Sequence, residues 1–276
     1  MPYIESHAGK KPVKIYYEDH GEGKPILLIH GWPLSGSMWE YQVPELLKKG
    51  FRCITYDRRG FGKSDFPEDG YDYDTMAGDL KTLIDELNVS GITLVGFSMG
   101  GGEIAKYFSL HDGAGVSKVI LISAVTPFML KTEDNPEGVP VDVFAEIEAS
   151  IQMDRPSFLH GFNKDFYGVE FMSKPVSDSY LNMAVVKGME SSPLATLGCA
   201  RAFATTDFRK DMPTINVPAL VIHGDQDKTV PIKATGEQSA TLIPNAKLVV
   251  YEGEPHGLWF TQKIQLTEDI AAFAAE

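Results

Sequence analysis

Cysteine is scarce in this chain, and long apolar segments are missing. Cys53 and Cys199 are the only cysteines among 276 residues, which is too few for a disulfide framework or a cysteine-rich metal site, so we expect two buried thiols. No segment approaches the roughly 18 apolar residues that cross a bilayer, and residues 1–7 lack the apolar stretch of a signal peptide. The sequence therefore predicts a cytoplasmic protein.

Basic side chains are few relative to acidic ones. The 25 Lys and Arg residues against 38 Asp and Glu residues give a formal net charge of −13 at pH 7. This excess repels phosphate backbones and anionic membrane surfaces. We therefore expect a small-molecule substrate, with no nucleic acid and no membrane as a partner, and the sequence is compatible with a homo-oligomer.

Signatures of metal and phosphate sites are also missing. The seven histidines include no i, i+4 pair with the glutamate of a metalloprotease helix, so we expect no metal. Residues 56–64 end in Gly-Lys-Ser like a phosphate-binding loop. Asp57, however, stands where that loop needs glycine, and its carboxylate would repel phosphate.

Short apolar runs alternate with helix-like segments along most of the chain, and 43% hydrophobic residues can fill a large core. The expected strands are 13–17, 25–29, 51–56, 92–95, 119–123, 219–222 and 248–251, and the expected helices include 75–87, 103–109 and 264–275. The first strand has the alternation of an antiparallel strand. Strands that alternate with helices predict an α/β fold with a mostly parallel, doubly wound sheet.

This alternation stops in the middle of the chain. Between residues 125 and 204 the sequence turns to aromatic, Pro-broken helical segments such as 141–151 and 157–166. We therefore expect a helical cap at 125–204, inserted into a core formed by 1–124 and 205–276.

A G-x-S-x-G pattern at residues 96–100 follows an apolar run and precedes helical spacing. Strand, turn and helix in this order are typical of the nucleophile elbow of the α/β-hydrolase fold, which exposes the serine Oγ at the tip of a sharp turn. The flanking glycines leave the space that such a turn needs. Ser98 is therefore the candidate nucleophile.

A serine hydroxyl needs a base within hydrogen-bond reach and an acid that orients the base. His256 lies in the loop after the last expected strand, where elbow hydrolases carry their base. Two carboxylates follow the preceding strand. We expect Asp225, nearer the strand, to hold the turn through backbone N–H groups, and Asp227 to reach the imidazole.

The reaction also creates an oxyanion, which backbone N–H groups can stabilise. The loop at 30–33 follows an apolar strand, so Trp32 is the expected first donor and Met99, after the nucleophile, the second. Pro33 has no N–H and fixes the backbone beside the site. We expect His30 to hold this loop by hydrogen bonds rather than to transfer protons.

Aromatic side chains gather in the expected cap. We expect Phe128, Phe162 and Phe166 to line an apolar substrate pocket above Ser98, together with Pro33. The alternative is that these rings form the core of the cap.

The chain resembles the bacterial cofactor-free haloperoxidases, also called perhydrolases, and their aryl esterase and γ-lactamase relatives. The resemblance rests on the motifs at 30–33, 56–64, 96–103, 223–227 and 255–257 and on the cap stretches 138–144 and 162–168. It implies a triad of Ser98, Asp227 and His256, with Trp32 and Met99 as oxyanion donors and no cofactor. A proline after the oxyanion tryptophan, here Pro33, is associated in that family with perhydrolysis.

The expected function is a serine hydrolase of small or aryl carboxylic esters that works through an acyl-enzyme. Water would release a carboxylic acid, and hydrogen peroxide would release a peracid, which oxidises halide in solution. Lactone or γ-lactam opening on the same triad is one alternative, because selectivity depends on the shape of the pocket. A non-catalytic ligand-binding protein of the same fold is the other.

Overall fold

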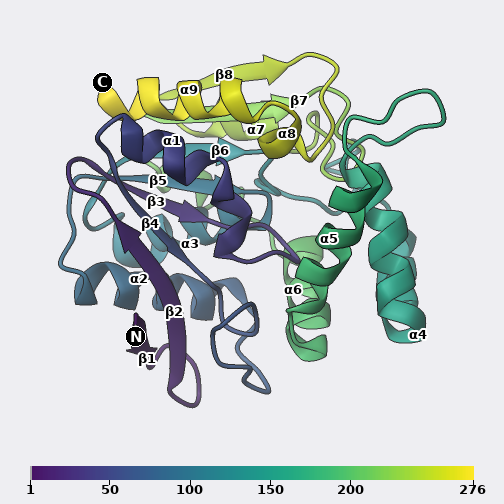
Figure 1. Ribbon diagram of the computed structural model, residues 1–276, viewed down its shortest axis with the longest axis horizontal. Helices are drawn as coiled ribbons and strands as arrows, with labels where there is room; N and C mark the ends of the chain where they lie inside the picture. The colour runs from purple at the N-terminus through teal and green to yellow at the C-terminus, as the bar shows by residue number, and fades with distance from the viewer. Residues whose placement is uncertain (1) are drawn as a thin grey trace.

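Eight strands form one sheet in the computed structural model, which describes residues 2–276 (Figure 1). The strands are β1 (Tyr3–Ser6), β2 (Val13–His20), β3 (Pro25–Ile29), β4 (Arg52–Tyr56), β5 (Ile92–Phe97), β6 (Val116–Ile122), β7 (Ala219–Gly224) and β8 (Ala246–Tyr251). Their order across the sheet is β1-β2-β4-β3-β5-β6-β7-β8, and only the β1–β2 and β2–β4 pairs are antiparallel. The predicted mostly parallel sheet is confirmed, with β1 as an additional edge strand.

Helices cover both faces of the sheet (Figure 1). Helices α1 and α9 pack together on one face, and α2 and α3 pack together on the other. The helices outside the cap are α1 (Gln42–Lys48), α2 (Tyr73–Glu86), α3 (Met99–His111), α7 (Gly236–Leu242), α8 (Leu258–Thr261) and α9 (Lys263–Ala275), with short 3₁₀ turns η1 (Gly36–Glu40) and η2 (Met212–Thr214).

The continuous apolar run of β3 explains why both faces are covered. Successive side chains of a strand point to opposite faces. Leu27 accordingly packs in one buried cluster with Leu80 of α2, while Leu28 packs in a second cluster with Leu46 of α1. Each strand of this kind contributes to two hydrophobic cores, which fixes the sheet between its helical layers.

Three helices between β6 and β7 lie together beyond the carboxyl ends of the parallel strands (Figure 1). We call α4 (Val141–Phe166), α5 (Asp178–Met189) and α6 (Pro193–Thr205) the cap helices. The two expected helices 141–151 and 157–166 are the two halves of α4, which are separated by a kink at Asp154, where the backbone is non-helical (φ −157°, ψ 85°). The kink lies two residues before Pro156, which has no N–H for the helix ladder. The limits of the cap at 125 and 204 stay a prediction.

Both cysteines are buried thiols, as expected. Burial raises the pKa of Cys53 and of Cys199 to about 12. Among residues 2–276, no helix has the combination of length and apolar content that crossing a bilayer requires.

Candidate active site

Ser98 occupies a strained turn between β5 and α3. Its backbone has φ 53° and ψ −116°, a conformation that residues with a Cβ rarely adopt. The turn is tight: a Cβ on Gly96 would lie 2.8 Å from backbone atoms of Gly100, and a Cβ on Gly100 would lie 2.9 Å from the carbonyl oxygen of Ile29. Glycine at both positions therefore allows the reversal that presents the serine at the strand end.

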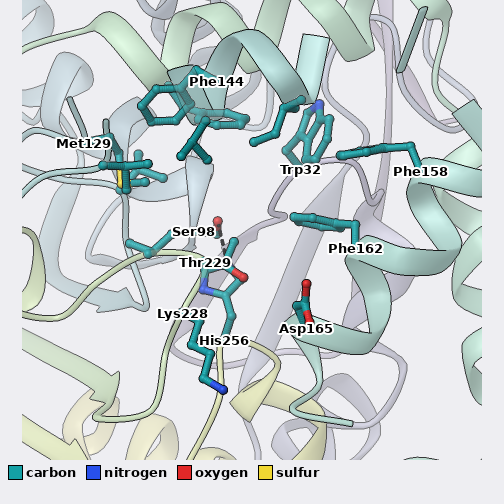
Figure 2. A pocket seen from close by; sticks show the side chains of 16 residues that line it. Trp32, Ser98, Met129, Phe144, Phe158, Phe162, Asp165, Lys228, Thr229 and His256 are labelled. Atoms are coloured by element: carbon teal, nitrogen blue, oxygen red, sulfur yellow. Dashed lines mark hydrogen bonds between the residues drawn. The ribbon is translucent and has the colours of Figure 1, made fainter. Parts of the chain in front are cut away.

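A hydrogen-bonded chain of three buried side chains starts at this serine. Ser98 Oγ lies 2.9 Å from Nε2 of His256, and Nδ1 of His256 lies 2.6 Å from Oδ2 of Asp227. The exposed fractions of Ser98, Asp227 and His256 are 6%, 6% and 1%. The three residues come from the elbow and from the loops after β7 and β8, and Figure 2 shows the serine and histidine facing each other. The structure thus brings the three expected catalytic residues together.

The Asp227 carboxylate is held by the main chain as well as by the imidazole. Its Oδ1 accepts hydrogen bonds from the N–H groups of Thr229 (2.9 Å) and Val230 (2.7 Å). Burial opposes ionisation, but the electrostatic interactions and side-chain hydrogen bonds with His256 and His223 outweigh it, and the pKa of Asp227 lies below its usual range. Asp225 instead accepts from the N–H of Gly253 at 2.7 Å, so it joins the turn after β7 to the loop after β8 rather than holding its own turn, a role that Oδ1 of Asp227 fills.

A second histidine, which the sequence pattern did not reveal, lies beside the same carboxylate. The ring of His223, on β7, is fully buried, and its Nε2 lies 2.9 Å from the carbonyl oxygen of Val230 and 3.3 Å from Oδ2 of Asp227. The carbonyl oxygen is an obligatory acceptor, so Nε2 carries the proton. His223 therefore adds a donor near Asp227 and fixes the turn that follows β7.

The two expected oxyanion donors lie on separate segments. Trp32 is in the loop after β3, and its indole N–H donates to the carbonyl oxygen of Thr196 on cap helix α6 at 2.9 Å. Met99 is the first residue of α3, where a backbone N–H has no partner within the helix. The role of both N–H groups in binding an oxyanion stays a prediction.

His30 joins the loop after β3, which carries Trp32, to the loop after β4. Its Nε2 accepts from the backbone N–H of Arg58 at 3.0 Å, so the ring proton is on Nδ1, which lies 2.9 Å from the carbonyl oxygen of Gly31. Burial lowers the pKa of His30 well below its usual value, with a further contribution from the charge of Arg58. This neutral, fully bonded imidazole fits the expected role in holding the loop.

The loop that resembles a phosphate-binding loop is occupied by its own carboxylate. Asp57 accepts hydrogen bonds from the backbone N–H groups of Gly36 and Lys63, both at 2.8 Å. The amides that an anion would need therefore already have an acceptor. Within residues 2–276, no three His, Cys, Asp or Glu side chains form a group that could hold a metal ion.

A cavity of about 410 Å³ opens beside Ser98. It is lined by Trp32, Ser98, Val125, Met129, Val139, Val143, Phe144, Ile147, Phe158, Phe162, Asp165, Phe203, Lys228, Thr229, Val230 and His256. Figure 2 shows the apolar side chains of Met129, Phe144 and Trp32 on one side of the serine, with Asp165 and Lys228 on the side of His256. The cavity thus suits an apolar substrate with one polar end.

The structure corrects part of the expected pocket lining. Phe162 lines the cavity, but Phe128, Phe166 and Pro33 do not. The ring of Phe128 packs under the Arg209 guanidinium, 5.0 Å from ring centroid to Cζ. Phe166, one helical turn after Phe162, packs against the imidazole of the triad instead of the open space.

Pro33 faces the cap rather than the cavity. A Cβ built on Gly188 of α5 would lie 3.4 Å from Cγ of Pro33. The Pro33 ring therefore packs the loop that carries Trp32 against cap helix α5.

An eight-stranded, mostly parallel sheet with a Ser–His–Asp chain at its carboxyl edge defines an α/β hydrolase. The family model described as alpha/beta hydrolase fold matches residues 24–262, and the chain belongs to this family. Over 262 residues it is 41% identical to a non-heme chloroperoxidase of Kitasatospora aureofaciens, covering 94% of this chain and 93% of the relative. Over 276 residues it is 38% identical to a bifunctional esterase/perhydrolase of Acinetobacter calcoaceticus, covering 99% of each.

Solved structures agree with these relatives. The crystal structure of a bromoperoxidase from Bacillus anthracis matches with a TM-score of 0.94 at 44% identity, covering 99% of this chain and 100% of that one. The resemblance to the cofactor-free haloperoxidases is thus confirmed over nearly the whole chain.

Proposed function

We propose that this protein is a serine hydrolase of small or aryl carboxylic esters that also transfers the acyl group to hydrogen peroxide. The observation that carries the proposal is the 2.9 Å contact between Ser98 Oγ and His256 Nε2, backed by Asp227 at 2.6 Å, in the wall of a mainly apolar cavity. The names of two relatives, a non-heme chloroperoxidase and a bifunctional esterase/perhydrolase, support the peroxide-dependent part.

Acylation follows from the geometry of the triad. Ser98 Oγ attacks the ester carbonyl carbon while its proton passes to Nε2 of His256. The ionised Asp227 stabilises the imidazolium that forms, and the N–H groups of Trp32 and Met99 donate to the oxyanion. The C–O bond to the alcohol then breaks, and the alkoxide leaves with the proton from His256.

Deacylation repeats these steps with a second nucleophile. His256 takes a proton from water or from hydrogen peroxide, and the resulting oxygen nucleophile attacks the acyl carbonyl. Collapse of the second tetrahedral intermediate returns the proton to Ser98 and releases a carboxylic acid or a peroxyacid. A peroxyacid oxidises bromide to hypobromous acid in solution and returns to the carboxylic acid, so the halide needs no site on the protein.

The test compares the wild-type protein with Ser98→Ala. We expect the variant to lose hydrolysis of p-nitrophenyl acetate and formation of peracetic acid together, each by at least about 10³-fold, and to lose labelling by a fluorophosphonate probe. Peracid formation that survives in the variant would rule out a shared acyl-enzyme. A wild-type protein that neither turns over esters nor takes the label would instead be a ligand-binding protein.

A further inference from the structure

A buried ion pair lies between the two segments that carry the proposed oxyanion donors and is hydrogen-bonded to one of them. Glu103 lies on α3, the helix that begins at Met99, and Arg58 lies in the loop after β4. Their side chains are 0% and 1% exposed, and Arg58 contacts Glu103 through both Nη2 and Nε. The hydroxyl of Tyr56 donates to the other carboxylate oxygen at 2.5 Å. Both oxygens of the Glu103 carboxylate therefore have hydrogen-bond partners.

Arg58 also holds the loop that leads to Trp32, in part through the Nη2 that contacts Glu103. Arg58 Nη2 donates to the carbonyl oxygen of His30 at 2.8 Å, and the Arg58 backbone N–H donates to the His30 ring at 3.0 Å. His30 is two residues before Trp32. A continuous path of charge-assisted hydrogen bonds therefore runs from the helix that begins with one donor to the loop that carries the other.

The contribution of the Arg58–Glu103 pair to stability does not by itself explain why it is buried. Burying two charges costs more desolvation energy than burying apolar side chains of the same size, so the pair contributes little net stability. A role in fixing the local geometry accounts better for its presence. An oxyanion hole needs its donors within about 0.5 Å of their working positions. The two donors follow the neighbouring strands β3 and β5, whose pairing extends to Ile29 and Gly96. Beyond these strand ends, the separation of the donors depends on the contacts that hold the Trp32 loop and the first turn of α3.

We propose that Arg58 and Glu103 are positioning residues that set the separation between the backbone N–H groups of Trp32 and Met99. The proposal rests on the proposed function, because it concerns the oxyanion of the acyl-transfer reaction. Neither side chain lines the cavity, so both act through the segments they join.

The chain offers a matched control in the next residue. Arg59 donates to Asp79 through Nε and Nη2, both at 2.6 Å, and the two side chains are 1% and 2% exposed. Asp79 lies on α2 and also accepts from Ser6 of β1 at 2.5 Å. This second buried pair therefore has the same chemistry and burial, but it ties the loop after β4 to α2, and through Ser6 to β1, and contacts neither the Trp32 loop nor α3.

The experiment uses Glu103→Gln and the neutral double variant Arg58→Gln/Glu103→Gln, with Arg59→Gln/Asp79→Asn as the control. Steady-state hydrolysis of p-nitrophenyl acetate gives kcat and KM, and phenylboronic acid, which forms a tetrahedral adduct on the serine, gives an inhibition constant. We expect kcat to fall about tenfold or more with KM within about threefold, and the inhibition constant to rise in parallel. The control is expected to change each quantity less than about threefold.

The neutral double variant covers the case in which Glu103→Gln leaves Arg58 unpaired and does not fold. All variants are compared at a temperature where circular dichroism shows the native signal. A folded double variant with wild-type kcat and boronate affinity would overturn the proposal, and so would a control that loses both to the same extent. Failure of the proposed function looks different, since the wild-type protein would then lack ester turnover and fluorophosphonate labelling.

Discussion

The ring of Phe166 stands edge-on against the imidazole of His256, with ring centroids 4.7 Å apart and an interplanar angle of 85°. Phe97 covers the same imidazole from the elbow side, at 5.0 Å and 40°. Phe166 is the last residue of α4, so the histidine is held between the core and the cap helices. Edge-to-face contacts of this kind restrict how the imidazole can tilt.

Replacing Phe166 by Leu is therefore expected to lower kcat about tenfold, because a small misplacement of the base slows proton transfer from Ser98. Saturating p-nitrophenyl acetate measures kcat directly. Phe158→Leu is the matched control, since Phe158 also lies on α4 but lines the cavity, and it should change KM more than kcat. Equal effects of the two substitutions on kcat would contradict a specific contact with the base.

The lowered pKa of Asp227 predicts how stability depends on pH. The carboxyl group titrates near pH 4 in the unfolded chain and below its usual range in the folded one. Its ionisation therefore stabilises the fold above about pH 4, and this contribution is lost as the pH falls below that value. The difference in free energy of unfolding between wild type and Asp227→Asn should thus be largest above about pH 5 and shrink toward about pH 2.

The same substitution should lower kcat by about 10³- to 10⁴-fold at pH 7, because asparagine cannot stabilise the imidazolium. Urea unfolding at several pH values and ester hydrolysis measure the two effects. Asp225→Asn is the control, since the amide oxygen can still accept from Gly253, and activity should stay within about twofold. A gap in stability between wild type and Asp227→Asn that stays constant over the whole pH range would refute the assignment of the shift.

The catalytic residues could be predicted from the sequence because steric and turn requirements act between residues close in the chain. The elbow needs glycine at 96 and 100 for steric reasons that hold in any sequence. The choice of Asp227 over Asp225 as the partner of His256 agrees with the structure, although Asp227 also holds the turn after β7. The pocket lining was less predictable, because it depends on how the kinked helix α4 is rotated over the sheet. Phe162 and Phe166 are one turn apart, yet one faces the cavity and the other the triad histidine.

His223 and the Arg58–Glu103 pair show a second limit of sequence reasoning. His223 ends an apolar strand, and nothing in its neighbours indicates that its ring points toward Asp227. Arg58 and Glu103 are 45 residues apart, and they meet because Arg58 follows β4 and Glu103 lies near the start of α3, which follows β5 at the same edge of the sheet. Contacts between distant segments follow from tertiary packing, which periodicity and spacing do not contain.

The strained backbone of Ser98 predicts a stability difference between two inactive variants. Alanine keeps a Cβ at φ 53°, whereas glycine tolerates this conformation. The strain relieved, about 1–3 kcal/mol, exceeds the extra unfolded-state entropy of glycine, about 0.5–1 kcal/mol. Ser98→Gly should therefore be more stable than Ser98→Ala by about 1 kcal/mol, as measured by urea unfolding. If alanine were the more stable of the two, the turn would not store strain.

Phe162 lines the cavity and Phe128 does not, so the two residues should differ in their effect on the preferred acyl chain length. Phe162 lines the cavity beside Trp32, with ring centroids 5.4 Å apart, so Phe162→Leu should enlarge the space and shift the preferred p-nitrophenyl ester toward longer acyl chains. One added methylene in an apolar pocket changes kcat/KM by at least about tenfold when it fits. Phe128→Leu removes a ring that packs on Arg209 outside the cavity, so its chain-length profile should match that of the wild type. A shifted profile in Phe128→Leu, or none in Phe162→Leu, would mean that the acyl group occupies another part of the molecule.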